Sequence, residues 1–177
     1  DNPPIQELFK GLVEDHERNA MICDDVAAAV TGGRNCLVLT QRTEHIDRLV
    51  AGLAERETSA LVLKGGLGKK ARTAVRDVLD DESARGLVLV GTGSYLGEGF
   101  DWPTLDTLFL AAPMAWRGRV EQYAGRLLRA HADKTDVEVH DYVDVLVPVL
   151  ARMHVKRLTG YAKLGFDVRA ARRASRS

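Results

Sequence analysis

The stretch LVLVGTGSYLGEGFDWP, residues 87–103, decides how the rest of the sequence is interpreted. An apolar run typical of a buried strand ends in a loop that is unusually rich in glycine. Polar residues alternate with these glycines as far as Asp101, which makes the loop more polar than a simple turn requires. Glycine-rich loops after strands often bind phosphates, so the loop has to be compared with the known phosphate-binding motifs. The glycines are Gly91, Gly93, Gly97 and Gly99.

Two common phosphate-binding motifs are excluded by spacing. The pattern Gly91-x-Gly93-x-x-x-Gly97 is one residue longer than the dinucleotide fingerprint, and Pro103 prevents a helix from following it directly. The segment KGGLGKK, residues 64–70, has Leu63 where a P-loop needs its first glycine and Lys70 where it needs Ser or Thr. The chain therefore lacks a phosphate-gripping loop of its own.

Short apolar runs on both sides of this stretch alternate with segments of helical periodicity. Continuous apolar strands separated by amphipathic helices are typical of a parallel sheet that is covered on both faces. The sequence therefore predicts an α/β domain with an open, mainly parallel sheet, whose ligands bind at the carboxyl ends of the strands. Strands are expected at 36–40, 60–64, 86–91, 107–112 and 137–143, and helices at 5–17, 24–30, 45–56 with Thr43 as a plausible cap, 69–81, 120–129 and 145–163.

Composition is that of an ordinary soluble globular protein. Of the 177 residues, 45% are apolar and 28% charged, and 25 basic residues balance 25 acidic ones, so net charge does not predict a polyanionic partner. No apolar run is long enough to span a membrane, and no membrane partner is expected. Cys23 and Cys36 have neither metal-ligand nor redox spacing, which favours reduced cysteines, a cytoplasmic location and no protein-bound metal. Because the chain begins with Asp1 rather than Met, it is expected to be a piece of a longer protein.

A second cluster of polar residues lies downstream, in RVEQYAGRLLRAH, residues 119–131. Arg126 and Arg129 are three residues apart and share one face of a helix, and Gln122 precedes them by one turn. Gly125 lacks a side chain beside them, which predicts a close approach to another group. Two arginines on one face can bind a phosphate through paired hydrogen bonds, although a solvated helix face is the alternative for this stretch alone.

Taken together, the two stretches are more specific. Thr92-Gly93 through Asp101, followed by Gln122-x-x-Gly125-Arg126-x-x-Arg129, resembles motifs V and VI of superfamily 2 helicases and translocases. Upstream, LVLTQRTEHIDRL (37–49) resembles motif IV, and LKGGLGKKAR (63–72) resembles the glycine-containing segment that follows it. The resemblance runs in order over residues 35–145, and it is nearest to the helicases related to type III restriction subunits.

This resemblance implies the second RecA-like domain of a two-domain ATPase. The N-terminal RecA-like domain, which would bind most of ATP and Mg²⁺, is expected elsewhere in the same polypeptide. Residues 1–34 would form N-terminal helices, 35–145 the RecA-like core, and 146–177 a C-terminal helix and a basic tail. That tail is either a solvated end of the chain or a contact for a polyanion. The fragment alone is expected to be inactive as an enzyme.

The resemblance also implies roles for individual residues. Arg129 would be the arginine finger and Arg126 a second phosphate contact, and the sequence leaves these two roles interchangeable. Asp101 would accept a hydrogen bond from the ribose, Gly99 would allow the backbone to approach ATP, and Gln122 would couple the nucleotide to the nucleic-acid side. Nucleic-acid contacts would come from Thr40, Arg42, His45, Gly65, Thr92, Gly93 and Ser94.

Two departures from the family pattern indicate which branch of the helicases the chain resembles. Tyr123 stands beside Gln122, where many relatives have arginine, and Leu127-Leu128 is more apolar than the Thr-Gly of DEAD-box members. Both favour the restriction-type branch, and hence DNA rather than RNA. Two alternatives stay open: a stand-alone nucleotide- or cofactor-binding α/β module, and a non-catalytic RecA-like scaffold. The first needs a glycine-rich loop after its first strand, where the sequence is TQRTEH; the second predicts that the two arginines are lost.

Overall fold

A computed structural model describes residues 3–93, 100–129, 131–132 and 134–169. Five parallel strands form one sheet in the order β2-β3-β1-β4-β5, so the predicted α/β fold is confirmed. The strands are β1 (Cys36–Thr40), β2 (Leu61–Leu63), β3 (Val88–Thr92), β4 (Thr107–Leu110) and β5 (Glu138–Asp141). The helices are α1 (Ile5–Glu14), α2 (His16–Thr31), α3 (Thr43–Ala54), α4 (Lys69–Leu79), α6 (Glu121–Leu127) and α7 (Pro148–Lys163), and a π-helical turn, η1 (Trp116–Val120), leads into α6.

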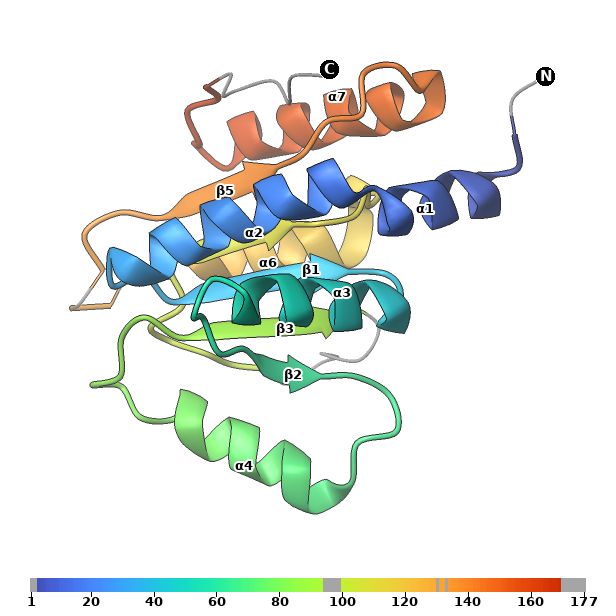
Figure 1. Cartoon of the computed structure of the whole chain (residues 1–177). Coiled ribbons are helices and arrows are strands. Elements are labelled where there is room, and N and C mark those ends of the chain that lie inside the picture. Colours follow the sequence, from blue (N-terminus) through green and yellow to red (C-terminus); the bar gives the residue numbers. More distant parts are fainter. Residues whose placement is uncertain (1–2, 94–99, 130, 133, 170–177) are drawn as a thin grey trace.

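The sheet separates two apolar cores, because successive side chains of a strand point to opposite faces. On β1, Cys36 and Val38 pack into one core, with residues of α2 and α3 such as Ile22 and Leu49. The intervening Leu37 and Leu39 pack into the other core with residues of α6 and α7. Figure 1 shows the same arrangement, with α2 and α3 in front of the sheet, α6 behind it, and α4 below β2. The uninterrupted apolar strands are thus explained by burial on both faces.

The N-terminal helices differ from the prediction. A first helix over residues 5–17 and a separate short helix over 24–30 were expected, but the chain breaks at Asp15 and then continues as one helix from His16 to Thr31. The reason is a helix cap, since the Asp15 carboxylate accepts a hydrogen bond from the Arg18 backbone N–H at 3.0 Å. Helix α1 consequently projects past the edge at which the strands end (Figure 1).

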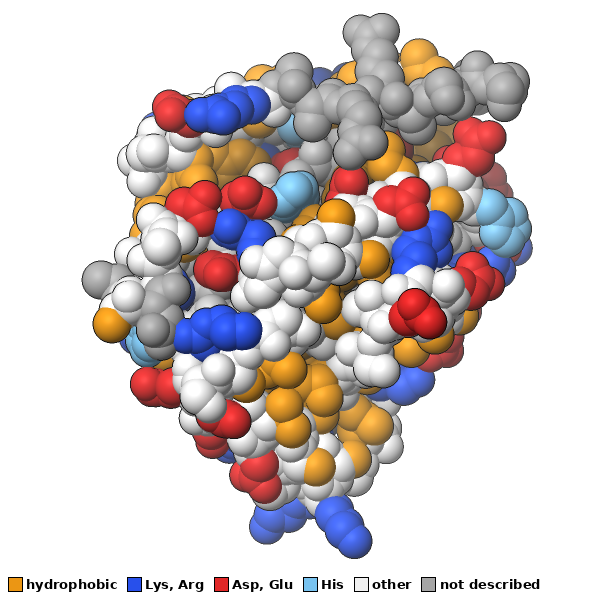
Figure 2. Space-filling view, turned by 60° about the vertical axis from the view of Figure 1, so that its left-hand side comes forward, with side chains coloured by type: hydrophobic (Ala, Val, Ile, Leu, Met, Phe, Trp, Pro, Cys, Tyr) orange, Lys and Arg blue, Asp and Glu red, His pale blue; other side chains and the backbone are white. Residues whose placement is uncertain are grey.

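The surface mixes charges of both signs. Figure 2 shows basic and acidic side chains interspersed on one face, together with a hydrophobic patch in its lower part. Among the described residues, no helix is long and apolar enough to cross a membrane, and no group of three or more His, Cys, Asp or Glu side chains is arranged to hold a metal ion.

Candidate nucleotide and nucleic-acid site

The two arginines of the downstream stretch contact the segment that follows the glycine-rich loop. Arg126 Nη1 donates a hydrogen bond to the Phe100 carbonyl, and Arg129 Nη1 lies 2.8 Å from Asp101 Oδ1. The Phe100 and Tyr123 rings pack edge to face with their centroids 6.1 Å apart, which fixes α6 against this segment. The structure therefore brings together residues that lie more than 25 positions apart in the sequence and that the motif pattern linked.

The surroundings of Arg129 differ from those expected. Helix α6 ends at Leu127, so Arg129 lies just beyond it rather than inside a helix over 120–129. Lys134, which the sequence did not single out, caps this end: its Nζ donates to the carbonyls of Leu127 (3.3 Å) and Arg129 (3.1 Å). Burial lowers the pKa of Lys134, and the positive charge of Arg129 lowers it further. The sequence signal that could have identified Lys134 is its position shortly after a predicted helix.

A shallow, open depression of about 240 Å³ lies beside this helix end. Arg129, Lys134 and Asp136 contribute to its lining, so it combines two basic side chains with an acidic one. Gln122 is exposed on α6. Gly125 is exposed too, and a Cβ placed there would meet no described atom within 4 Å apart from the neighbouring backbone. No described residue of this chain makes the close approach predicted at Gly125, and an approach by a bound group stays a prediction.

Three of the predicted nucleic-acid contacts, Thr40, His45 and Thr92, have buried side chains. Thr40 Oγ1 and His45 Nδ1 are 2.6 Å apart, and His45 Nε2 is 2.8 Å from Asn19 Oδ1 on α2. Thr40 is 0% exposed and His45 1% exposed, so neither side chain can reach a bound strand in this structure. Burial, and the charges of Arg18 and Arg48, lower the pKa of His45 to about 4, which keeps the ring neutral. The prediction of direct contact is corrected to a structural role that joins β1 to α2 and α3.

The predicted nucleic-acid contacts other than Thr40 and His45 have different surroundings. Arg42 is partly exposed, and its Nη2 donates to Gln6 Oε1 (2.7 Å) and to the Gln6 carbonyl (3.2 Å), which ties it to α1. Gly65 is exposed in the loop after β2, whereas Thr92 and Gly93 are buried at the end of β3. Ser94 and Gly99 lie outside the described residues.

Side chains of three elements hold the segment that connects β4 to η1, residues 111–115, which we term the approach segment. The carbonyl of Ala111 accepts a hydrogen bond from Arg18 Nη1, and that of Pro113 accepts one from Gln41 Nε2 at 2.6 Å. The carbonyl of Met114 accepts one from Arg157 Nη1 at 2.8 Å. The course of the chain into α6 is thus fixed by donors from α2, from the loop after β1 and from α7.

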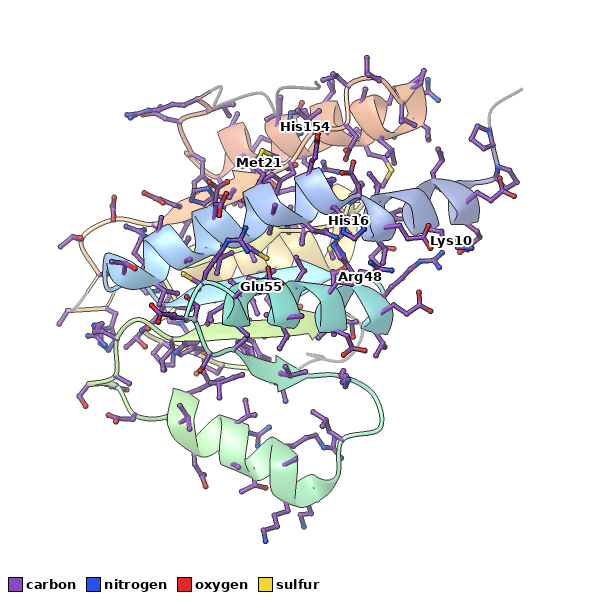
Figure 3. The ribbon with its side chains drawn as sticks, viewed as in Figure 1. Lys10, His16, Met21, Arg48, Glu55 and His154 are labelled. Carbon is purple, nitrogen blue, oxygen red and sulfur yellow. The ribbon has the colours of Figure 1, made fainter. Side chains whose placement is uncertain are left out.

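Arg157 belongs to a buried network at the end of β5. Its Nε and Nη2 lie 2.7 and 2.9 Å from the two carboxylate oxygens of Asp141, and Tyr161 donates to Asp141 Oδ2 at 2.8 Å. His154, labelled on α7 in Figure 3, is 3.3 Å from Asp141 Oδ1. Burial by itself would raise the pKa of Asp141, but the hydrogen bonds and charge of Arg157 lower it overall. Removing one member of such a buried pair costs about 3–5 kcal/mol of stability.

Comparisons with solved structures show which fold this chain shares with known proteins. No protein-family model matches the chain. Among solved structures, UvsW of phage T4 aligns with a TM-score of 0.70 at 20% identity, over 90% of this chain and 35% of UvsW. The C-terminal domain of the DEAD-box protein Dbp5 aligns with a TM-score of 0.56 at 16% identity, over 81% of this chain and 78% of that domain. Helicase Lhr of Mycobacterium smegmatis, solved bound to ssDNA and AMP-PNP, aligns with a TM-score of 0.57 at 19% identity, over 78% of this chain and 19% of Lhr. The fold is therefore RecA-like, as in helicase C-terminal domains.

Sequence relatives are viral proteins. The uncharacterized protein 108L of Invertebrate iridescent virus 3 is 39% identical over 90 residues, which are 50% of this chain and 78% of that protein. The transcript termination protein A18 of fowlpox virus is 27% identical over 166 residues, 89% of this chain and 35% of A18. The A18 protein of Yaba monkey tumor virus is 28% identical over 131 residues, 71% of this chain and 26% of A18. The chain thus spans about a third or less of these two A18 proteins.

Proposed function

This chain belongs to the same family as protein 108L of Invertebrate iridescent virus 3, and from that premise and its RecA-like fold we propose that it is the second RecA-like domain of an ATP-dependent nucleic-acid helicase or translocase. The name of protein 108L assigns no activity, so the proposal depends on the site. One observation carries it: Arg126 and Arg129 converge on Phe100 and Asp101, where an ATP-facing surface requires its cations.

In this proposal ATP binds between two RecA-like domains. The partner domain of the same polypeptide holds the phosphates and Mg²⁺, because this chain has no P-loop of its own. Arg129, which is exposed, supplies positive charge to the γ-phosphate as charge redistributes in the transition state, and Arg126 makes a second phosphate contact. Asp101 accepts a hydrogen bond from the ribose, the backbone at Gly99 lies close to the nucleotide, and Gln122 links it to the nucleic-acid side.

The nucleic acid crosses the carboxyl edge of the sheet in this proposal. Arg42 supplies a side-chain contact to the phosphates, and Gly65, Thr92, Gly93 and Ser94 supply mainly backbone N–H groups. Recognition through the backbone of the strand gives little sequence preference. We further propose DNA as the substrate and the restriction-type branch as the closest relation, on the strength of the apolar Leu127-Leu128 pair.

Arg129→Ala in the full-length protein tests the proposal. We expect nucleic-acid-stimulated ATP turnover to fall about 10³-fold or more, because arginine fingers contribute about 10³- to 10⁵-fold. Nucleic-acid affinity and the thermal midpoint should stay near those of the wild type, since the side chain is exposed. Arg152→Ala, a change at another exposed arginine, on α7, is the matched control and should retain turnover. Unchanged turnover in Arg129→Ala would reject the finger assignment.

A further inference from the structure

The approach segment connects β4 to η1 and α6; Arg126 lies on α6, and Arg129 lies just beyond its end. The carbonyl groups of the approach segment at Ala111, Pro113 and Met114 each accept a hydrogen bond from a different side chain, as described above. Backbone carbonyls of a connecting loop are usually satisfied by water or by neighbouring backbone. Three side-chain donors on five residues therefore restrain the direction in which the chain enters η1.

Each of the two arginine donors also binds a carboxylate, either at the end of β5 or in the loop that follows β5. Arg157, 1% exposed, forms paired hydrogen bonds with Asp141, and Arg18, 5% exposed, lies 3.2 Å from Asp144 through its Nε. A guanidinium can bind a carboxylate with one edge and a carbonyl with another, because its five N–H groups are fixed in one plane. Lysine cannot reproduce this geometry, so each arginine links an acid to the approach segment in a defined orientation.

Two other residues of α7, Gly160 and Tyr161, contact Trp116 at the end of the approach segment that leads into η1. Trp116, the first residue of η1, packs edge to face on Tyr161 with ring centroids 5.1 Å apart, and its indole occupies the space beside Gly160. Tyr161 donates to the same Asp141 that holds Arg157. Asp141 thus fixes two side chains of α7, one contacting the carbonyl of Met114 and the other the ring of Trp116.

We propose that Arg157 and Arg18, together with Asp141 and Asp144, are positioning residues that hold the approach segment so that Arg126 and Arg129 point at the nucleotide. This inference rests on the proposed function and adds residues to it that contact neither ATP nor nucleic acid. Misplacing a reacting group by about 1 Å can cost about 10²-fold in rate. Loosening the approach segment therefore impairs turnover through Arg129, without removing any group that binds the substrates.

The first test uses the 177-residue chain itself. Arg157→Lys keeps the charge but loses the planar fork, and we expect amide hydrogen exchange in η1 and α6 to become at least about ten-fold faster. The matched control is Arg56→Lys, because Arg56, which lies just after α3, also binds an aspartate, Asp24 at 2.6 Å, and a backbone carbonyl, that of Gly52 at 2.8 Å. Exchange in η1 and α6 should be unaffected by the control. Unchanged exchange in Arg157→Lys would overturn the inference.

The second test uses the full-length protein. Arg157→Lys should lower kcat about 10- to 100-fold and leave the KM for ATP and the nucleic-acid Kd within about two-fold. The double variant with Arg129→Ala should be no slower than Arg129→Ala alone, because both changes remove the same transition-state contact. A purely structural role would instead lower the thermal midpoint and leave kcat of the folded protein unchanged, which would overturn the inference.

Two outcomes separate this inference from the proposed function. If Arg129→Ala abolishes turnover and Arg157→Lys does not change it, the function stands and the positioning role is wrong. If Arg129→Ala leaves turnover intact, the function itself fails and the inference fails with it. Should Arg157→Lys not fold, Gln41→Ala replaces it, because Gln41 is exposed and its loss removes only the contact to the Pro113 carbonyl. The same exchange and kcat criteria then apply to Gln41→Ala.

Discussion

Arg129 and Asp101 form an ion pair in which each side chain is more than half exposed, at 59% and 58%. Exposed pairs of this kind add at most about 1 kcal/mol to stability, because water screens the charges and ordering the side chains costs entropy. The pair therefore contributes little to the stability of the fold, which agrees with the proposed role of both residues in binding a nucleotide.

Asp101→Asn should distinguish a role of Asp101 in the stability of the fold from a role in ATP turnover. We expect the free energy of unfolding to change by less than about 1 kcal/mol, while ATP turnover of the full-length protein falls at least about ten-fold because the proposed ribose contact is weakened. Urea unfolding and a steady-state ATPase assay measure the two effects. Asp24→Asn, which breaks the pair between an exposed aspartate and the partly buried Arg56, is the control and should change neither quantity appreciably. A large loss of stability in Asp101→Asn would contradict the prediction.

His45 should make the stability of the fold depend on pH. Because burial lowers its pKa from 6.5 to about 4, the folded state binds fewer protons than the unfolded state between these values. Its contribution is fully present above pH 6.5 and is lost as the pH falls toward 4, by about 2 kcal/mol between pH 7.5 and pH 5. Urea unfolding at both pH values should show that His45→Gln removes this part of the decrease. An identical decrease in both proteins would show that other groups cause it.

At the scale of the elements, α7 and η1 are fitted to each other through Gly160. A Cβ at this position would overlap the indole of Trp116, which cannot move aside easily because Tyr161 packs against it. The glycine is thus kept for space, even though glycine costs a helix about 1 kcal/mol relative to alanine.

Gly160→Ala and Gly125→Ala should therefore change stability in opposite directions. Gly160→Ala should lower the free energy of unfolding by roughly 1–3 kcal/mol, because overpacking outweighs the gain in helix propensity. Gly125→Ala, at an open position of α6, should raise it by roughly 0.5–1 kcal/mol. Urea unfolding of the two variants measures both. Equal effects would mean that the α7 contact with η1 is loose.

The sequence predicted the elements whose signal is local. The apolar runs at 36–40 and 107–112 correspond to β1 and β4, and the parallel sheet followed from their lack of alternation. The break at Asp15 was missed because the residues around it are polar on both sides and a cap inside such a run leaves no change of period. The π-helical turn was missed because it depends on how Trp116 packs on α7, which is distant in sequence.

In the candidate site, too, the features with a local sequence signal were predicted, and those that depend on residues distant in sequence were missed. The contact of Arg126 and Arg129 with residues 100–101 agrees with the order and spacing of two motifs. Thr40 and His45 were assigned to nucleic acid because they lie at the end of a strand in the segment that resembles motif IV, but a short contact with Asn19 of α2 holds His45 in the interior. The three side-chain hydrogen bonds to the approach segment could not be predicted from the sequence. Their acceptors are backbone carbonyls, which every residue has, so no residue type marks them.

At the scale of the whole molecule, the chain has the RecA-like fold but no phosphate-binding loop. We expect the purified 177-residue chain to hydrolyse ATP no faster than buffer, and the full-length protein to do so when nucleic acid is added. A coupled phosphate-release assay with excess single-stranded DNA measures both. Robust turnover by the chain alone would mean that it contains a nucleotide site of another kind.

The division of the interior into two cores gives each face of the sheet a different chemical probe. Both cysteines, Cys23 and Cys36, are buried in the core under α2 and α3, and burial raises their thiol pKa values to about 11 and about 12. Both tryptophans, Trp102 and Trp116, belong to the opposite core. The rate of thiol alkylation therefore measures how fast the core that contains the cysteines becomes exposed, and indole fluorescence reports on the core that contains the tryptophans. Comparing the two rates distinguishes a protein that opens one layer at a time from a protein that unfolds as a single unit.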